Sequence, residues 1–212
     1  STYTEDSSNP AVGVIAHLGT GGTLGRRDTV YMIGLKSYAG SPRYLDEVLL
    51  PFSKSVYDGT QNFRKMLDEA KDIQWNAEQK QLKYMLADKW YNDTSERDAR
   101  IYYTYCYGKL NCSGTSYEDG WFVPSRNELT AILKNKKSIN EGLKHIPNAD
   151  GIGYSSYVSS SYYANGSLCY YCDWNSTTGL LNEPKSGGYL TIYYICFVFP
   201  IPIDDVYANL KY

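Results

Sequence analysis

The stretch Asp119-Gly-Trp-Phe-Val-Pro-Ser-Arg-Asn-Glu-Leu129 joins a predicted strand directly to a predicted helix. Pro124 restricts the residue before it to extended geometry, so the aromatic run that precedes it is expected to arrive as a strand. Ser125 stands where a helix N-cap belongs, and Glu128 follows three residues later, which is the spacing of a capping box. Apolar residues then continue at helical spacing. The stretch therefore predicts a buried strand that turns into a capped helix.

Composition indicates a single-domain globular protein. The chain has 212 residues, with 21 basic and 23 acidic side chains. A chain of this length can bury about 70% of its unfolded surface, so it needs no metal or disulfide to fold. The sequence contains no run of basic residues that could follow a phosphate backbone, and nucleic acid is therefore not expected as a partner. No apolar segment reaches the roughly 18 residues that cross a bilayer. Residues 1–10 are polar and are expected to be a flexible segment, neither signal nor transit peptide.

The N-terminal part predicts a hairpin. Residues 11–18 and 29–35 have the composition of strands, and a glycine-rich loop at residues 19–25 joins them. Leu24 stands where a dinucleotide-binding fingerprint needs its third glycine, and no Gly-Lys-Ser/Thr follows. A hairpin turn is therefore favoured over a phosphate cradle.

Helical spacing predicts three helices between this hairpin and the corner. Thr60 is expected to cap the first, whose apolar stripe reaches Ile73. Asn76 is expected to cap the second, over residues 77–91, and Ser95 to open the third. Their methionine and aromatic stripes are typical of core packing. After the corner, Ser138 and Glu141 repeat the capping-box spacing and predict a short further helix.

Tyrosine is concentrated in the C-terminal part. Residues 154–194 hold 9 of the 23 tyrosines, and tyrosine is typical of interfaces because it offers a large rigid ring with a polar tip. Residues 168–174 alternate as a strand, with Tyr170 and Cys172 in the bulkier set that should face the core. The other set includes Tyr171 and should face solvent. Residues 195–199 are apolar throughout and predict a central buried strand.

These motifs carry a resemblance to a known family. The corner resembles the Gly-Trp-x-Leu-Pro-[Ser/Thr]-x-x-Glu-Leu signature of bacterial domains with a C-type-lectin-like fold, with Val123 where leucine is usual. That group includes the variable proteins of diversity-generating retroelements. Residues 157–163 resemble its Tyr-Trp-Ser-Ser-x-x-Tyr segment, although Val158 replaces the tryptophan. Residues 194–199 take the place of its closing Tyr-Val-Arg-Pro-Val-Arg strand, although both arginines are missing. A Gly-Thr-x-Asn sequence before the corner also fits, and residues 77–91 would be an insertion.

The resemblance implies an α+β, C-type-lectin-like domain over residues 11–212, with an antiparallel sheet and flanking helices. It implies binding rather than catalysis, with a protein or glycan ligand on another cell or surface. The expected location is extracellular, on the cell surface (including a lipid-anchored form), or in a phage tail. The ligand-binding part would span about 154–196. In diversified members, mutation of adenines in Asn-type codons yields residues such as Asn, Tyr, Ser, Asp and Cys. Residues of these and similar types make up the candidate binding site: Tyr157, Tyr162, Tyr163, Asn165, Ser167, Cys169, Tyr171, Asp173, Asn175, Tyr189, Thr191 and Tyr193.

Two other classes stay open, a structural subunit of a surface appendage or phage tail, and an enzyme on the same fold. Sulfatase-activating enzymes combine a lectin-like fold with catalytic cysteine, but no paired-cysteine or Ser–His–Asp arrangement stands out here. Cys169 and Cys172 lie three apart on a predicted strand, so their sulfurs should point to opposite faces. A zinc site that adds Cys106 and Cys112, a disulfide between those two, and weak calcium binding at residues 204–205 remain alternatives. No cofactor, metal or catalytic residue is expected.

Overall fold

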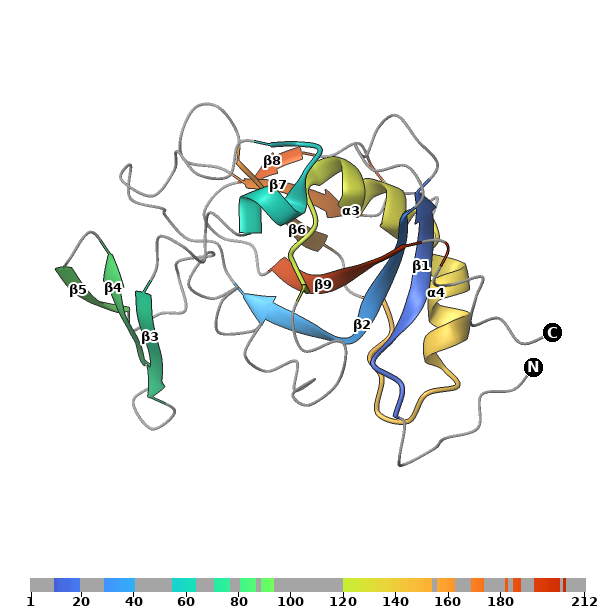
Figure 1. Cartoon of the computed structure of the whole chain (residues 1–212), viewed down its shortest axis with the longest axis horizontal. Helices are drawn as coiled ribbons and strands as arrows, with labels where there is room; N and C mark the ends of the chain where they lie inside the picture. The colour runs from blue at the N-terminus through green and yellow to red at the C-terminus, as the bar shows by residue number, and fades with distance from the viewer. Residues whose placement is uncertain are drawn as a thin grey trace.

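The structure is a computed structural model that describes residues 10–19, 29–40, 55–63, 71–76, 81–86, 89–93, 120–153, 156–162, 169–173, 182, 185–187, 193–202 and 204. Its main body is α+β, with two helices packed against a six-stranded sheet of order β1-β2-β9-β6-β7-β8 (Figure 1). The strands of this sheet are β1 (Gly13–Gly19), β2 (Thr29–Gly40), β6 (Ser156–Tyr162), β7 (Cys169–Asp173), β8 (Lys185–Gly187) and β9 (Tyr193–Pro202).

The sheet is mixed rather than antiparallel. Strand β6 pairs with β9 in parallel, through Tyr157 and Tyr194, while the other neighbours in the sheet are antiparallel. The expectation of an antiparallel sheet is therefore wrong for this one pair. The reason lies in the topology, because β8 ends at the end of the sheet where β6 ended, whereas β9 begins at the end where β6 began.

The N-terminal hairpin is confirmed. Strands β1 and β2 pair antiparallel, from Gly13 opposite Gly34 to Gly19 opposite Thr29, with a β-bulge between Ile15 and His17. The bulge increases the local twist of an edge strand.

Strand β9 is the central buried strand that its apolar run predicts. Residues 195–198 are buried, and Phe199 is half-buried. The Phe197 ring lies 6.0 Å from that of Tyr38 and 5.9 Å from that of Phe63. The Trp121 ring lies 5.5 Å from that of Phe199. An uninterrupted apolar sequence suits this strand because it is covered on both faces.

The capped helix at the corner is confirmed as α3 (Arg126–Leu133), with both bonds of the capping box formed between Ser125 and Glu128. The strand expected just before it is wrong, because residues 121–123 are buried but form only an isolated β-bridge between Phe122 and Val198. A short helix follows as α4 (Lys136–Leu143), but its predicted cap is wrong. The N-cap is Asn135, and Ser138 is an exposed residue inside the helix. The two helices follow each other so closely that α4 begins before the Ser/Glu pair is reached.

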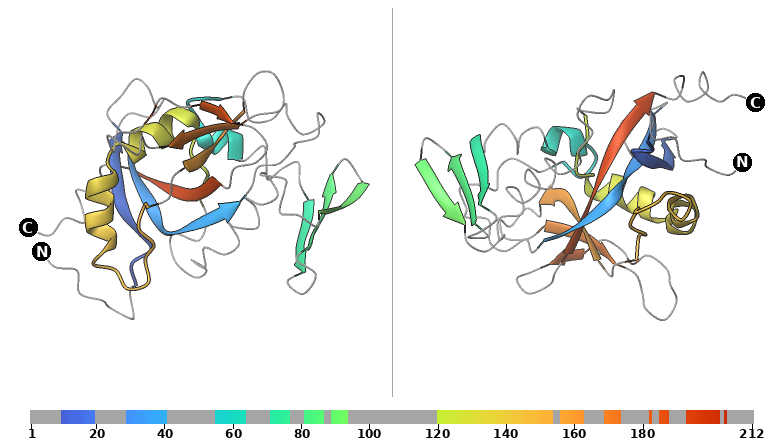
Figure 2. Two further views of the ribbon diagram at one scale, coloured as in Figure 1. Left: turned by 180° about the vertical axis from the view of Figure 1, so that it is seen from behind. Right: turned by 90° about the horizontal axis from the view of Figure 1, so that it is seen from below.

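The helices predicted around residues 60–91 are largely wrong. A helical turn exists at residues 59–63, and Asp58 caps it, because its carboxylate accepts a hydrogen bond of 2.9 Å from the Gln61 N–H. Downstream lies a second antiparallel sheet of β3 (Lys71–Asn76), β4 (Gln81–Leu86) and β5 (Lys89–Asp93). Figures 1 and 2 show it beside the main body, at the side away from α4.

Pairing between neighbouring strands explains the error in this region. Residues 81–84 alternate polar and apolar, and β4 pairs with a strand on each side, Leu82 lying opposite both Trp75 and Asp93. The helical spacing of Leu82 and Met85 is thus outweighed by a three-stranded ladder. The helix predicted from Ser95 lies outside the described residues. No helix that the structure describes is long and apolar enough to cross a membrane.

Candidate ligand-binding site

Strand β6 holds two of the predicted binding residues and pairs with β7, which holds three more. Its residues from 156 to 161 are buried on both faces, and Ser159, Ser160 and Ser161 are fully enclosed. The Ser160 N–H donates to the Pro124 carbonyl at 2.9 Å. The Ser161 hydroxyl donates to the Ser55 carbonyl at 2.7 Å and accepts from the Arg126 N–H at 2.9 Å. Because the Ser161 hydroxyl bonds to two other segments, it can be buried without being left unsatisfied.

A buried carboxylate joins the corner to the helical turn at residues 59–63. Glu128 Oε2 accepts hydrogen bonds from the backbone N–H of Ser125 (2.8 Å) and of Gly59 (2.9 Å), and Oε1 accepts one from the Tyr31 hydroxyl (3.3 Å). Burial raises the pKa of Glu128, and the hydrogen bonds from Ser125 and Gly59 oppose that rise without cancelling it. Residue 59 must be glycine, because a Cβ there would lie 2.5 Å from both Glu128 Oε2 and the Ser125 nitrogen.

Asn62 extends the same network to β6. Its side-chain oxygen accepts from the Ser55 N–H (3.1 Å), while its nitrogen donates to the Ser55 carbonyl (2.7 Å) and to the Ser160 hydroxyl (3.4 Å). The Gly-Thr-x-Asn sequence thus supplies two residues, Gly59 and Asn62, that hold distant segments together. Sequence reasoning gave neither residue a role, and their spacing within that short motif was the one signal that could have pointed to them.

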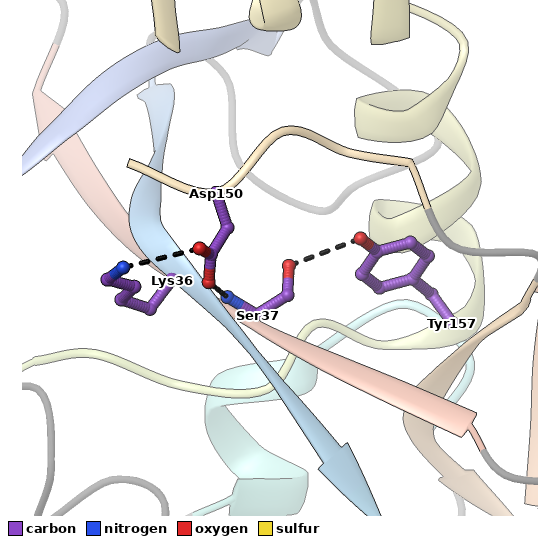
Figure 3. A network of polar contacts seen from close by, with 4 residues as sticks. All are labelled: Lys36, Ser37, Asp150 and Tyr157. Carbon is purple, nitrogen blue, oxygen red and sulfur yellow. Dashed lines mark hydrogen bonds and ion pairs between the residues drawn. The ribbon is translucent and has the colours of Figure 1, made fainter. Parts of the chain in front are cut away.

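Tyr157 is not on the ligand-facing surface where it was expected, and that prediction is wrong. Its ring is fully buried and packs 6.1 Å from the Tyr194 ring. Its hydroxyl shares a hydrogen bond of 3.1 Å with the Ser37 hydroxyl. Asp150 accepts from the Ser37 N–H and from Lys36 Nζ, both at 3.2 Å (Figure 3). Tyr157 therefore belongs to the core, because both faces of β6 are covered where it lies.

The backbone places five more predicted residues. Tyr162 pairs with Cys169 at one end of the β6–β7 ladder, Tyr171 pairs with Val158, and Asp173 pairs with Ser156 at the other end. Tyr193 begins β9 opposite Gly40, at the end of the sheet where Asp173 lies. The structure thus brings Tyr162 and Cys169 together, and it places Asp173 and Tyr193 at the opposite end. The outward direction predicted for the side chains of Cys169, Tyr171 and Asp173 lies outside what the structure describes, as do the remaining predicted residues: Tyr163, Asn165, Ser167, Asn175, Tyr189 and Thr191.

The chemistry of the described residues is that of packing and hydrogen bonding. Within the ranges that the structure covers, no group of three or more His, Cys, Asp and Glu side chains could hold a metal ion. Cys196 forms no disulfide within the described residues and is enclosed in the core. Cys106 and Cys112 lie outside the described residues, so the alternatives that involve them stay open.

Replacing Ser125 with alanine should cost about 1 kcal/mol of unfolding free energy, because the Ser125 hydroxyl accepts from the Glu128 N–H at the start of α3. Chemical denaturation of the two proteins measures this cost. Ser138→Ala is the matched control, since Ser138 is exposed within α4 and should change stability by less than about 0.5 kcal/mol. Equal effects of the two changes would contradict a capping role for Ser125.

Comparison of the chain with models of protein families, with curated proteins and with solved structures found no match.

Proposed function

We propose that this chain is a ligand-binding protein of the receptor or adhesin kind, built on a C-type-lectin-like fold. One observation carries the proposal. The strands from the tyrosine-rich part, β6, β7 and β8, are consecutive neighbours at one edge of the main sheet. Strands rich in Tyr and Ser therefore lie side by side at this edge, next to a fixed scaffold. Binding surfaces are commonly built in this way, with variable segments positioned by a rigid framework.

The enclosed scaffold supports the proposal. Strand β6 is bonded to the corner and to residues 55–62, so the strands beyond it start from a fixed position. A fixed base lowers the entropy cost of ordering a binding surface when a ligand arrives. Tyrosine suits such a surface because it has few rotatable bonds and can both pack and donate a hydrogen bond.

The lectin-like assignment rests on the corner and its partners. Three of the segments that resemble the family are the sequence motif at residues 119–129, the Gly59–Asn62 turn and the serine-rich strand β6. These segments contact one another through Glu128, Asn62 and Ser160. Motif residues that form one connected network favour a shared scaffold over separate chance matches. The proposed ligand is a protein or glycan on another cell or surface, met from a cell-surface, extracellular or phage-tail location.

The binding surface can be tested at Tyr171. The wild-type protein would be screened against a printed array of glycans and a displayed random-peptide library, and Tyr171→Ala would be compared on every hit. A tyrosine that anchors a ligand is expected to cost about 2 kcal/mol of binding when truncated, with a stability change of less than about 0.5 kcal/mol. The matched control is Tyr57→Ala, an exposed tyrosine in the 55–58 segment. If the ligands found in the screen bind Tyr171→Ala as tightly as Tyr57→Ala, the β6–β8 edge is not the binding surface.

We also propose that the C-terminal part is diversified by a retroelement. Nine tyrosines within residues 154–194, accompanied by Asn, Ser, Asp and Cys, support this idea because adenine mutation of Asn-type codons produces that set. Sequencing the neighbouring DNA tests it. A near-repeat of the last coding segment that differs at adenines, beside a reverse transcriptase gene, is the expected result. If the neighbouring DNA holds no such repeat, the proposed function is that of an adhesin whose sequence is not diversified.

A further inference from the structure

Helix α4 and its flanks carry a concentrated positive charge. Residues 134–144 hold four lysines and one glutamate, a net charge of +3, within a chain whose formal net charge is −2. Lys134, Lys137 and Lys144 are exposed, as is His145 directly after them. The opposite side of the helix is buried through Ile139 and Leu143. The charges are therefore displayed on one outer face, which we call the α4 face.

The cations of the α4 face are close to one another. Lys144 Nζ donates a hydrogen bond of 2.8 Å to Glu141 Oε1, in an ion pair whose side chains are both largely exposed. That bond lowers the pKa of Glu141, and Lys137 and His145 lower it further. Three basic groups therefore act on a single carboxylate. The helix is about 12 Å long, well within the Debye length of about 30 Å at 0.01 M salt, so in low salt an approaching anion would meet these charges as one multivalent site.

The α4 face lies away from the proposed ligand-binding edge. Helix α4 packs on β1, where a Cβ added at Gly142 would lie 3.4 Å from the Val14 side chain. Strands β1 and β8 are the two opposite edges of the six-stranded sheet. Figures 1 and 2 show α4 beside β1 in each view. The two surfaces can thus be occupied at the same time.

The side chains of the α4 face restrict the class of partner that it can bind. Its charges come from lysine, a point charge on a flexible stem that imposes no bidentate geometry. No Phe, Tyr, Trp, Leu, Ile, Val or Met is exposed among residues 134–148. The face thus lacks the apolar centre of a protein interface, the apolar side chains that insert into a bilayer and the aromatic platforms that stack nucleic-acid bases. We propose that the α4 face binds an acidic polysaccharide, a flexible chain with closely spaced carboxylate or sulfate groups.

Binding of fluorescent dextran sulfate to the full chain tests this proposal, with neutral dextran as the blank. Dextran sulfate should bind in low salt and weaken steeply between about 50 and 200 mM salt, because each neutralised charge releases a counterion. Lys137→Glu should weaken binding by about tenfold. It should leave the fold intact, since Lys137 is exposed in the first turn of α4, where an acidic residue is favourable. Lys83→Glu, the same change on exposed Lys83 of β4, should alter affinity by less than about twofold, because β4 lies at the side of the main body away from α4 (Figures 1 and 2) and salt screens distant surface charges.

Circular dichroism and thermal melting of the variants verify the fold, and Lys134→Glu serves as the second variant if Lys137→Glu does not fold. Equal losses for the α4 and β4 variants would overturn the proposal, as would failure to bind dextran sulfate in low salt. A single-stranded DNA oligonucleotide and vesicles that contain phosphatidylserine complete the test. Binding of either probe as tightly as dextran sulfate, with the same sensitivity to Lys137→Glu, would also overturn it. None of these outcomes depends on the ligand of the β6–β8 edge, so the two proposals can fail separately.

Discussion

Replacing Glu128 with alanine should destabilise the protein by about 3–5 kcal/mol. The substitution removes the acceptor of the Gly59 and Ser125 backbone N–H groups and of the Tyr31 hydroxyl, all within the core. A buried donor that loses its partner costs about 1–3 kcal/mol. Because this carboxylate links the corner to residues 55–62, which in turn hold β6, unfolding should remain a single transition. Urea denaturation followed by circular dichroism measures the change.

Glu128→Gln is the matched control and should keep most of the stability. Its amide oxygen can accept from Gly59 and Ser125, and its amide nitrogen can donate to the Tyr31 hydroxyl oxygen. A glutamine that destabilised as strongly as alanine would show that the negative charge, rather than the hydrogen bonds, stabilises this network.

The wild-type protein and Glu128→Gln should differ in how their unfolding free energy depends on pH. Burial raises the pKa of Glu128 in the folded chain, so the stability it contributes is fully present below the unfolded pKa of about 4.3 and falls as pH rises through the folded pKa. Glu128→Gln has no such proton to lose. The wild-type protein should therefore lose stability relative to Glu128→Gln as pH rises from about 4 towards neutrality. A difference that stays constant with pH would contradict a raised pKa.

Trp121→Ala should cost about 3–5 kcal/mol, the range for truncating a large aromatic residue in a core. The Trp121 ring is buried, packs 5.5 Å from the ring of Phe199 and lies over Gly34, where an added Cβ would come within 3.3 Å of it. Its removal would leave a cavity against β2 and β9, which are fixed by their own ladder and cannot collapse inwards.

Thermal and urea unfolding of three proteins measures this effect. Trp121→Phe should cost less than Trp121→Ala because it keeps part of the ring volume. Tyr57→Ala removes a comparably large ring from an exposed position and should stay within about 0.5 kcal/mol of the wild type. A loss for Trp121→Ala as small as that for Tyr57→Ala would place Trp121 outside the core.

The sequence predicts the capped helix of the corner and the central strand well because their signals are local. Pro124, Ser125 and Glu128 lie within five residues, and each restricts backbone or cap geometry by itself. The apolar run of β9 identifies a strand that is covered on both faces. The bond from Glu128 to Gly59 joins residues 69 apart, and only packing of the whole chain decides that partner. Local signals therefore predict the helices and strands, whereas the hydrogen bonds that connect them can be identified only once the fold is known.

The candidate site shows the same limit. Tyr157 has the residue type of a binding surface, but its position is decided by the sheet order, which places β6 beside β9. The residues at 81–86 can follow a helical or a strand period, and pairing with β3 and β5 decides in favour of the strand. In both cases a contact distant in sequence outweighs the local pattern.

Strand β6 limits how this protein can vary from one generation to the next. Residues 156–161 are enclosed on both faces, so a larger side chain there has no room. A smaller one at Ser160 or Ser161 removes a hydroxyl that bonds to another segment. Heritable variation in the proposed binding surface therefore has to fall outside residues 156–161, because a change within them acts on folding before it acts on any ligand.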